Sequence, residues 1–331
     1  MAEPIKVSMT EDGIRLARWF GRHYPSVNIG ELRKLCRSGQ IRINSRRCRG
    51  DEILKSGDMV RVPPGATSRI ASEKPKRTES GERFSMRDLE NLRTRIIHDD
   101  ADIVVFDKPA GLATQGGTGI QKSLDKMAAA MFPHDKIMLV HRLDRDTSGV
   151  IVLAKNQRAA QLLAEEFSGR DAKKEYLALL SGNVSPKSGI IDNFMVKGRV
   201  ISDDEADELK KESGVRAHRA ITKYEVVSHL PGLVSWVRFS PVTGRTHQLR
   251  LHSAFSLNAP IVGDDIYGRC RSSDCESAAA TLRSFIDNNN LFLFAHRLSF
   301  KHPSTGKVVT VRAPLPDFMR GVAKLLELRT E

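Results

Sequence analysis

The chain has 331 residues, a formal net charge of +13 and a pI near 9.7. This length exceeds that of one small domain, so we expect one sizeable core plus one small module. The charge predicts attraction to polyanions, which leaves RNA, DNA and anionic membranes as partner classes. No apolar stretch approaches the roughly 20 residues of a membrane span, and residues 1–14 lack the order of a signal peptide. We therefore expect a cytoplasmic protein without a membrane partner.

Four cysteines are scattered along the chain, namely Cys36, Cys48, Cys270 and Cys275. In a long chain of this class we expect thiols rather than a disulfide framework. The close pair Cys270 and Cys275 has no second pair of metal ligands beside it, so no metal site is expected.

The first predicted elements form a small module over residues 13–63. Apolar residues at helical spacing predict helices over residues 13–24 and 30–39, the second ending on Gly39. Two short strands follow, separated by an Asn44-Ser45 turn, and residues 58–62 predict a closing strand. We expect a small α/β domain of two helices and a small sheet.

Basic side chains crowd the second helix and the following turn of this module. They are Arg33, Lys34, Arg37, Arg42, Arg46, Arg47 and Arg49. This crowding predicts a phosphate-binding face, with a merely solvated basic surface as the alternative. The Gly-x-Ile-x-Ile-Asn turn after a Leu-Arg-Lys helix resembles the alpha-L RNA-binding module of the ribosomal protein S-four type.

A polar segment and a larger domain follow. Residues 64–88 are rich in Pro, Ser, Lys and Glu and predict a flexible linker. Residues 89–328 carry recurrent short apolar runs with helical stretches such as 157–167 between them. Strands outnumber helices without regular alternation, which predicts an α+β domain on a mixed, mainly antiparallel sheet with surrounding helices. Residues 203–211 and 269–290 are interpreted as surface insertions.

The densest cluster of reactive residue types is His141-Arg142-Leu143-Asp144-Arg145-Asp146-Thr147-Ser148-Gly149. It lies between two apolar strands, so we expect a loop at a sheet edge or cleft, where catalytic groups concentrate. A salt-bridged polar turn is the alternative. A nucleophilic triad is disfavoured, because residues this close rarely converge and no Gly-x-Ser-x-Gly elbow is present.

A second cluster runs from Pro241 to His252 and includes Arg245, His247 and Arg250. If it is extended, Arg250 lies on one side of the strand and His247 on the other. Arg250 could then reach a cleft carboxylate. Residues 115–119 lack both a phosphate-loop and a Gly-x-Gly-x-x-Gly pattern, which gives nucleotide cofactors little support.

The sequence HRLDRDTSGVIVLAK, residues 141–155, resembles the signature of a pseudouridine synthase family that modifies uridines in ribosomal and transfer RNA. The segments KEYLAL and TGRTHQLRLH resemble later motifs of that family, and residues 108–112 and 263–268 fit the same pattern. With the amino-terminal module, the resemblance covers nearly the whole chain.

The resemblance implies a role for four residues of the larger domain. Asp144 would be the catalytic aspartate, Tyr176 the tyrosine that stacks on or deprotonates the base, and Arg250 the arginine paired with Asp144. Arg142 would fill the gap left by a flipped nucleotide, and no metal or organic cofactor is required. Phosphate contact or a buried ion pair remains open for Arg245, which we place among the RNA-binding residues.

The motif combination most resembles members that act on large-subunit ribosomal RNA, so we expect a monomeric enzyme whose partner is a large-subunit precursor or assembly intermediate. Two other functions remain open. One is a noncatalytic RNA-binding ribosome-assembly factor, and the other is a metal-free nuclease that uses His141 or His252.

Overall fold

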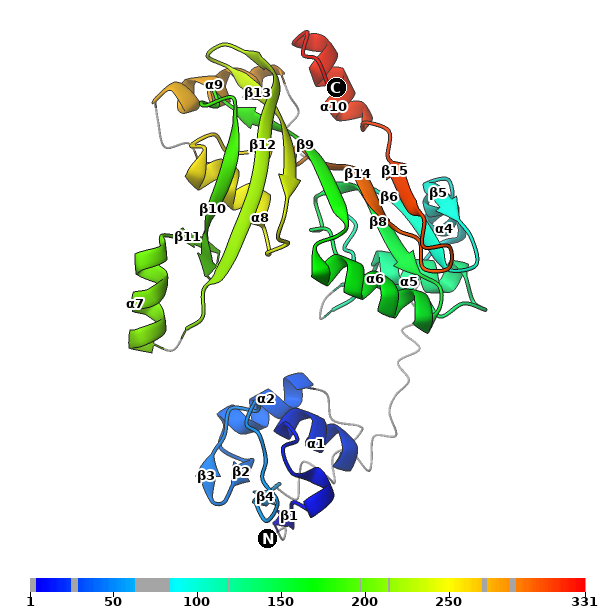
Figure 1. The fold of residues 1–331 in the computed structure, drawn as a ribbon, viewed down its shortest axis with the longest axis vertical. Helices are drawn as coiled ribbons and strands as arrows, with labels where there is room; N and C mark the ends of the chain where they lie inside the picture. Colours follow the sequence, from blue (N-terminus) through cyan, green and yellow to red (C-terminus); the bar gives the residue numbers. More distant parts are fainter. Residues whose placement is uncertain are drawn as a thin grey trace. The chain divides into compact units, whose positions relative to one another are not determined.

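The computed structural model describes residues 4–24, 29–62, 84–117, 120–196, 198–213, 215–269, 273–285 and 290–330. The chain divides into two compact units, Met1–Arg83 and Phe84–Glu331, which are described separately (Figure 1). In the described part of the chain, every helix is too short or too polar to cross a membrane.

In the described residues 4–24 and 29–62, the first unit has two α-helices against a four-stranded antiparallel sheet in the order β1-β4-β2-β3. Its elements are β1 (Ile5–Lys6), the 3-10 turn η1 (Met9–Glu11), α1 (Leu16–His23), α2 (Ile29–Arg37), β2 (Arg42–Ile43), β3 (Arg46–Arg47) and β4 (Met59–Arg61). Trp19, Phe20, Leu32 and Ile41 fill the core at 0–1% exposure.

The local signals of this unit match its structure, with one exception. Asn44 and Ser45 adopt φ values of 47° and 66°, which twist the β2–β3 hairpin as a two-residue turn requires. The expected start at residue 13 is wrong, because β1 pairs with β4. A two-residue strand is too short for hydrophobic periodicity to reveal it.

The second unit is built on an eleven-stranded sheet. Its strands are β5 (Ile96–Asp99), β6 (Ile103–Lys108), β7 (Met138–Leu139), β8 (Ser148–Ala154), β9 (Lys173–Ser181), β10 (Ser188–Val196), β11 (Arg199–Ile201), β12 (His218–Leu230), β13 (Val234–Pro241), β14 (Leu293–Lys301) and β15 (Val308–Arg312). Its helices are α4 (Met86–Arg93), α5 (Leu124–Met131), α6 (Gln157–Gly169), α7 (Asp203–Ser213), α8 (Gln248–Leu251), the π-helical turn η2 (His252–Ser256), α9 (Ser273–Phe285) and α10 (Asp317–Leu325).

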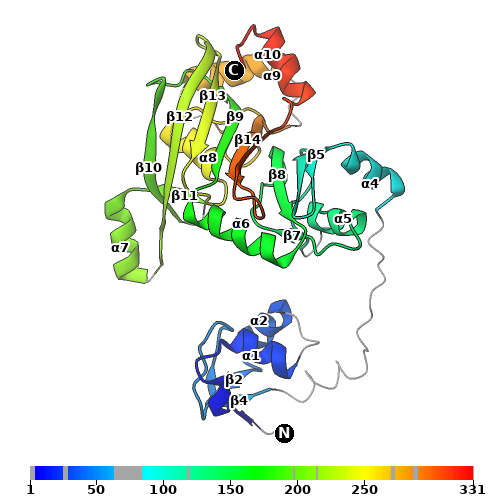
Figure 2. The same ribbon diagram turned by 45° about the vertical axis from the view of Figure 1, so that its right-hand side comes forward.

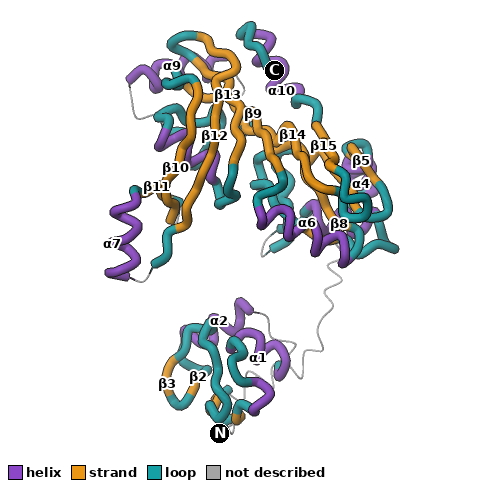
Figure 3. Tube along the Cα trace, in the orientation of Figure 1, coloured by secondary structure: helices purple, strands orange, loops and turns teal. Residues whose placement is uncertain are grey.

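The sheet order is β11-β10-β12-β13-β9-β14-β8-β6-β5, with β15 on β14 and β7 on β8. Among the described strands only β14 and β8 pair in parallel, which confirms the mixed, mainly antiparallel sheet. Helices lie around the sheet, and α7 extends beyond its β11 edge (Figures 2 and 3). Strand β8 is buried at all seven positions because helices and strands cover both its faces, so it reads as an unbroken apolar run.

Three expectations about this unit need correction. Helix α4 begins at Met86 with Ser85 as its N-cap, so the predicted linker ends too late. Residues 269–290 are not merely a surface insertion, because Leu282 of α9 joins the main core. Cys275 is disulfide-bonded, contrary to the expected thiol, whereas Cys36 and Cys48 are free.

Candidate active site

Three segments of the second unit surround a cavity of about 770 Å³. They are the β7–β8 loop, the start of β9 and the connection from β13 into α8, and residues 113–115 and the end of α6 also line the cavity. Its cationic lining residues are Arg142, Arg145, Arg170, Lys174, Arg245 and Arg250. Among the described residues that line it, Asp144 is the single carboxylate. The cavity is therefore suited to a polyanion, with one negative group placed inside it.

The Asp144 loop is fixed by contacts with another part of the chain. The Thr114 hydroxyl donates to the Leu143 carbonyl at 2.6 Å and accepts from the Leu143 N–H at 3.3 Å. Behind the loop, Gly149 has a φ of +110°, and a Cβ there would lie 2.2 Å from the Ala295 carbonyl oxygen. Only glycine fits this close approach of β8 to β14, which explains the last residue of the motif.

Lys108 binds the same loop through its side chain. Its buried ammonium donates to three carbonyls, those of Pro109, Leu112 and Arg145, at 2.8–3.0 Å. Burial lowers the pKa of Lys108 to about 7, against the opposing charges of nearby carboxylates including Asp144. The amine therefore joins residues 109–112 to the loop that carries Asp144.

Asp144 itself is left available for chemistry. Its side chain is 32% exposed, and its ionic contact is to His247, whose Nε2 lies 4.0 Å from Oδ2 of Asp144. Within the described residues, its carboxylate has no side-chain hydrogen bond. The motif contains an exposed salt bridge between Arg145 and Asp146, at 3.2 Å, but this pair does not include Asp144.

Tyr176 lies in the same cavity, on β9 between Phe239 of β13 and Ala295 of β14. Burial, together with the negative charge of Asp144, raises the pKa of Tyr176 well above its ordinary value. The phenol therefore stays neutral near pH 7. Of the two roles expected for it, stacking is compatible with this environment, whereas removal of a proton is opposed by it.

The predicted pairing of Arg250 with Asp144 is wrong in its direct form. The Arg250 guanidinium binds both oxygens of Asp264, at 2.8 and 2.6 Å, and the two side chains are 3% and 0% exposed. The exposed Asp265 accepts a further bond at 3.2 Å. The charge of Asp144 acts on Arg250 only at longer range. The guanidinium is engaged because Asp264, in the turn at residues 263–268, is a bidentate partner.

Arg250 and His247 were expected on opposite sides if residues 246–251 were extended. They are not extended, because Gln248–Leu251 form helix α8. The side chain of Gln248 fixes the start of this helix. Its Oε1 accepts from the Thr243 hydroxyl and the Arg245 N–H, and its Nε2 donates to two groups of β12. His247 precedes the helix as its N-cap, in a left-handed conformation, and both His247 and Arg250 line the cavity instead of facing opposite sides.

The two other predicted residues of this unit, Arg142 and Arg245, belong to the cavity lining. Both side chains are exposed. Sequence reasoning missed Arg170, which caps α6 in a left-handed conformation, and Lys174 at the start of β9. Lys174 is the first residue of the KEYLAL motif, but no role was assigned to it, and Arg170 belongs to none of the motifs.

The two histidines considered for a nuclease are unsuited to acid–base work. His141 accepts from the Val152 N–H through Nε2, and burial lowers its pKa to about 3. His252 is 0% exposed, contacts Thr222 and Asn193, and has its pKa lowered by burial to about 4. Both are neutral near pH 7 and engaged in hydrogen bonds.

In the first unit, a hollow of about 930 Å³ gathers part of the predicted basic face. Arg33, Arg37, Arg47 and Arg49 line it, around the thiols of Cys36 and Cys48. Lys34 and Arg46 are exposed but are not among its lining residues. The helix α2 and the β3 hairpin thus place four guanidinium groups around one concavity, as phosphate contacts require.

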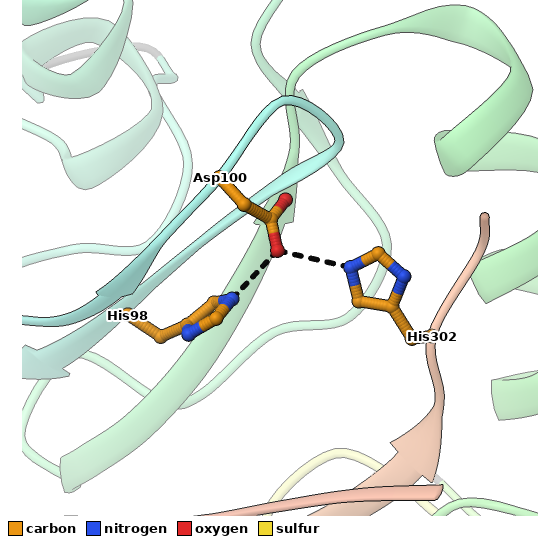
Figure 4. A group of neighbouring side chains, drawn as sticks. All are labelled: His98, Asp100 and His302. Atoms are coloured by element: carbon orange, nitrogen blue, oxygen red, sulfur yellow. Dashed lines mark hydrogen bonds and ion pairs between the residues drawn. The ribbon is translucent and has the colours of Figure 1, made fainter. Parts of the chain in front are cut away.

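A second titratable cluster lies outside the cavity lining, where β5 approaches the β14–β15 turn (Figure 4). Asp100 Oδ2 accepts from Nε2 of His98 at 2.6 Å and of His302 at 2.9 Å. Nδ1 of His302 accepts from the N–H groups of Ser304 and Thr305. Its Nε2 therefore carries the proton and offers no lone pair to a metal. We infer that this cluster joins the turn after β5 to the turn between β14 and β15.

Comparisons with known proteins give one consistent answer. Residues 102–255 match the family model described as RNA pseudouridylate synthase. The chain is 31% identical to the ribosomal large subunit pseudouridine synthase C of Escherichia coli O157:H7 over 317 residues, which are 96% of this chain and 94% of that protein. The protein of the same name from Vibrio vulnificus is also 31% identical, over 97% of this chain and 96% of its own length.

Solved structures agree in fold. The human RNA pseudouridylate synthase domain containing 4 is 27% identical, with a TM-score of 0.58 over 73% of this chain and 96% of its own. The human RNA pseudouridylate synthase domain containing 1 is 27% identical, with a TM-score of 0.50 over 72% of this chain and 96% of its own.

Proposed function

The chain belongs to the RNA pseudouridine synthase family and is therefore an isomerase acting on RNA; on that premise we propose that its substrate is large-subunit ribosomal RNA and that Asp144 is its catalytic carboxylate. The substrate proposal is supported by the relatives, which are named for the large ribosomal subunit. The proposal for Asp144 is carried by one observation. A carboxylate without a side-chain hydrogen bond among the described residues projects into a cavity whose lining also contains six arginine and lysine side chains.

The reaction explains why a carboxylate is needed there. The bond between carbon and nitrogen of the nucleoside must break, the uracil must rotate, and a carbon–carbon bond must form, without water or a redox change. An ionised carboxylate can attack as a nucleophile or remove a sugar proton. The chain's own residues supply this carboxylate, so we propose no cofactor.

Tyr176 and Arg142 would hold the target nucleotide. A uridine inside folded RNA must be extruded, at a cost of a few kcal/mol that stacking offsets. Tyr176 is neutral and lines the cavity beside Asp144, so we propose that it stacks on the uracil. Arg142 is exposed at the cavity rim, where its planar group can occupy the space the nucleotide leaves.

The basic face of the first unit would grip flanking RNA. We propose that Arg33, Lys34, Arg37, Arg46 and Arg47 contact phosphates, and that the enzyme acts as a monomer on a precursor or assembly intermediate. Reversing the charge of Arg33, Lys34 and Arg37 should weaken RNA binding at least tenfold and flatten its salt dependence. A matched variant reverses three exposed lysines of the second unit, Lys301, Lys307 and Lys324. Equal losses in both variants would reject a specific role for the first unit.

Asp144→Asn tests the catalytic proposal directly. Pseudouridine formation in transcribed large-subunit RNA should become undetectable, while RNA affinity stays within about threefold and the thermal midpoint stays unchanged, because the carboxylate contributes little to packing. Retained activity would refute the assignment.

A noncatalytic RNA-binding factor is the alternative for which a different outcome is expected. In that case Asp144→Asn would lower stability, and RNA from a strain lacking the protein would keep every pseudouridine. Mapping pseudouridines in total RNA with and without the protein therefore tests the substrate as well. End-labelled RNA should stay intact, since the neutral His141 and His252 supply no acid–base pair.

A further inference from the structure

A histidine occupies the position beside Asp144 that the sequence assigned to an arginine. Arg250 gives two of its nitrogens to the buried Asp264. The imidazole of His247, by contrast, points Nε2 at Asp144 Oδ2 from 4.0 Å. This is about 1 Å beyond a hydrogen bond, a gap that small side-chain rotations can close.

The backbone holds His247 in an unusual conformation. Its φ of 55° lies in the left-handed region, directly before α8. A non-glycine residue there costs roughly 1 kcal/mol, and such strain concentrates at functional sites. The buried helix maintains the conformation, since the His247 carbonyl accepts from the Leu251 N–H at 2.9 Å. The side chain is thereby aimed into the cavity instead of along the helix.

Tyr267 holds the opposite side of the imidazole. Its hydroxyl lies 3.0 Å from Nδ1 of His247. The tyrosine is itself fixed, because its ring packs against the Arg250 guanidinium at 5.4 Å and edge-on against Phe255. Its backbone N–H donates to Asp264 at 2.8 Å. The carboxylate that holds Arg250 therefore also positions the residue that holds His247.

These contacts define which ring nitrogen carries the proton. A phenol can donate to Nδ1 or accept from it, but the carboxylate of Asp144 can only accept. The favoured arrangement is therefore Tyr267 O–H to Nδ1 and Nε2–H toward Asp144. This arrangement presents a donor to the carboxylate whether the imidazole is neutral or charged.

We propose that His247 is a positioning residue for Asp144, oriented by Tyr267. The inference rests on the catalytic role proposed above for Asp144. His247 holds the carboxylate in one rotamer and stabilises its ionised form through Nε2–H, while Arg250 is retained by Asp264. Tyr267 acts only through the imidazole, by fixing its orientation and its proton.

Two substitutions at His247 separate this role from a structural one. His247→Asn tolerates the left-handed backbone but removes the group that reaches Asp144, whereas His247→Gln keeps an amide N–H at the position of Nε2. We expect His247→Asn to lower kcat about 10- to 100-fold with KM and RNA affinity within about twofold. His247→Gln should be faster than His247→Asn: its decrease in log kcat, relative to the wild type, should be smaller by at least a third. His229→Asn, at an exposed histidine of β12, is the matched control and should keep wild-type activity.

Tyr267→Phe completes the experiment, because it removes the hydroxyl and keeps the packed ring. It should lower kcat several-fold in the wild type and have no further effect in His247→Asn. The inference is overturned if His247→Asn keeps wild-type kcat, if His247→Gln is as slow as His247→Asn, or if the Tyr267 effect adds fully. Asp144→Asn in the same assay distinguishes the two proposals. If Asp144→Asn is inactive while His247→Asn keeps wild-type kcat, only the role of His247 is overturned. If Asp144→Asn is active, the catalytic proposal itself is overturned.

Discussion

Asp264→Asn should be the most destabilising conservative substitution near the cavity. It leaves the Arg250 guanidinium, 3% exposed, without its bidentate partner. The carboxylate also accepts from the N–H groups of Ile266 and Tyr267 at 3.0 and 2.8 Å. An amide replaces one of these acceptor oxygens by a donor that faces donors.

The magnitude follows from the burial of the pair. Removing one partner of a buried ion pair costs about 3–5 kcal/mol, because the other charge stays buried and uncompensated. For a unit of this size, each kcal/mol lowers the thermal midpoint by roughly 2–4 °C, so we expect a decrease of about 6–20 °C. Asp265→Asn is the matched control. Asp265 contacts the same guanidinium at 3.2 Å but is 81% exposed, so its loss should cost less than about 1 kcal/mol.

The assay can report on the second unit alone. The chain has two tryptophans, of which Trp19 belongs to the first unit and Trp236 to the second. In a Trp19→Phe background, urea and thermal unfolding followed by fluorescence therefore measure the second unit. A loss below about 1 kcal/mol for Asp264→Asn, or equal losses for Asp264→Asn and Asp265→Asn, would refute the reasoning. In an Arg250→Met background the cost of Asp264→Asn should shrink by at least half.

Three other substitutions test the support of the site. Gln248→Ala should lower the unfolding free energy by about 2–4 kcal/mol in urea denaturation, since four hydrogen-bonding groups lose their buried partner; a change below 1 kcal/mol would contradict this. Lys108→Met leaves three carbonyls unpaired beside the Asp144 loop, so both the thermal midpoint and kcat should fall; an unchanged kcat would show that the loop keeps its geometry without the amine. Burial lowers the pKa of His252 to about 4, against 6.5 unperturbed, so the unfolded chain binds more protons between these two values. Stability is therefore lost as pH falls through this window, by on the order of 3 kcal/mol. His252→Gln should flatten this dependence, and an equally steep curve in both proteins would assign it to other groups.

The sequence alone was enough wherever a local pattern controls structure. Recurrent short apolar runs, more numerous than the helical stretches, predicted the mixed, mainly antiparallel sheet. The motif at residues 141–149 indicated the cavity loop because its glycine and charged residues are contiguous in the chain. The long strands β10 and β12 were missed, since their outer faces are polar and only pairing with neighbouring strands defines them.

Only the tertiary structure could choose the partners of Asp144. Arg250 has the right charge and the right motif, but Asp264 lies closer and binds it with two bonds. His247 was placed on the wrong side because a strand and a helix orient neighbouring side chains differently, and the short helix α8 depends on Gln248 contacts with β12. Pairing between residues more than a hundred positions apart leaves no local pattern in one sequence. Tertiary packing therefore decided which side chain faces the carboxylate.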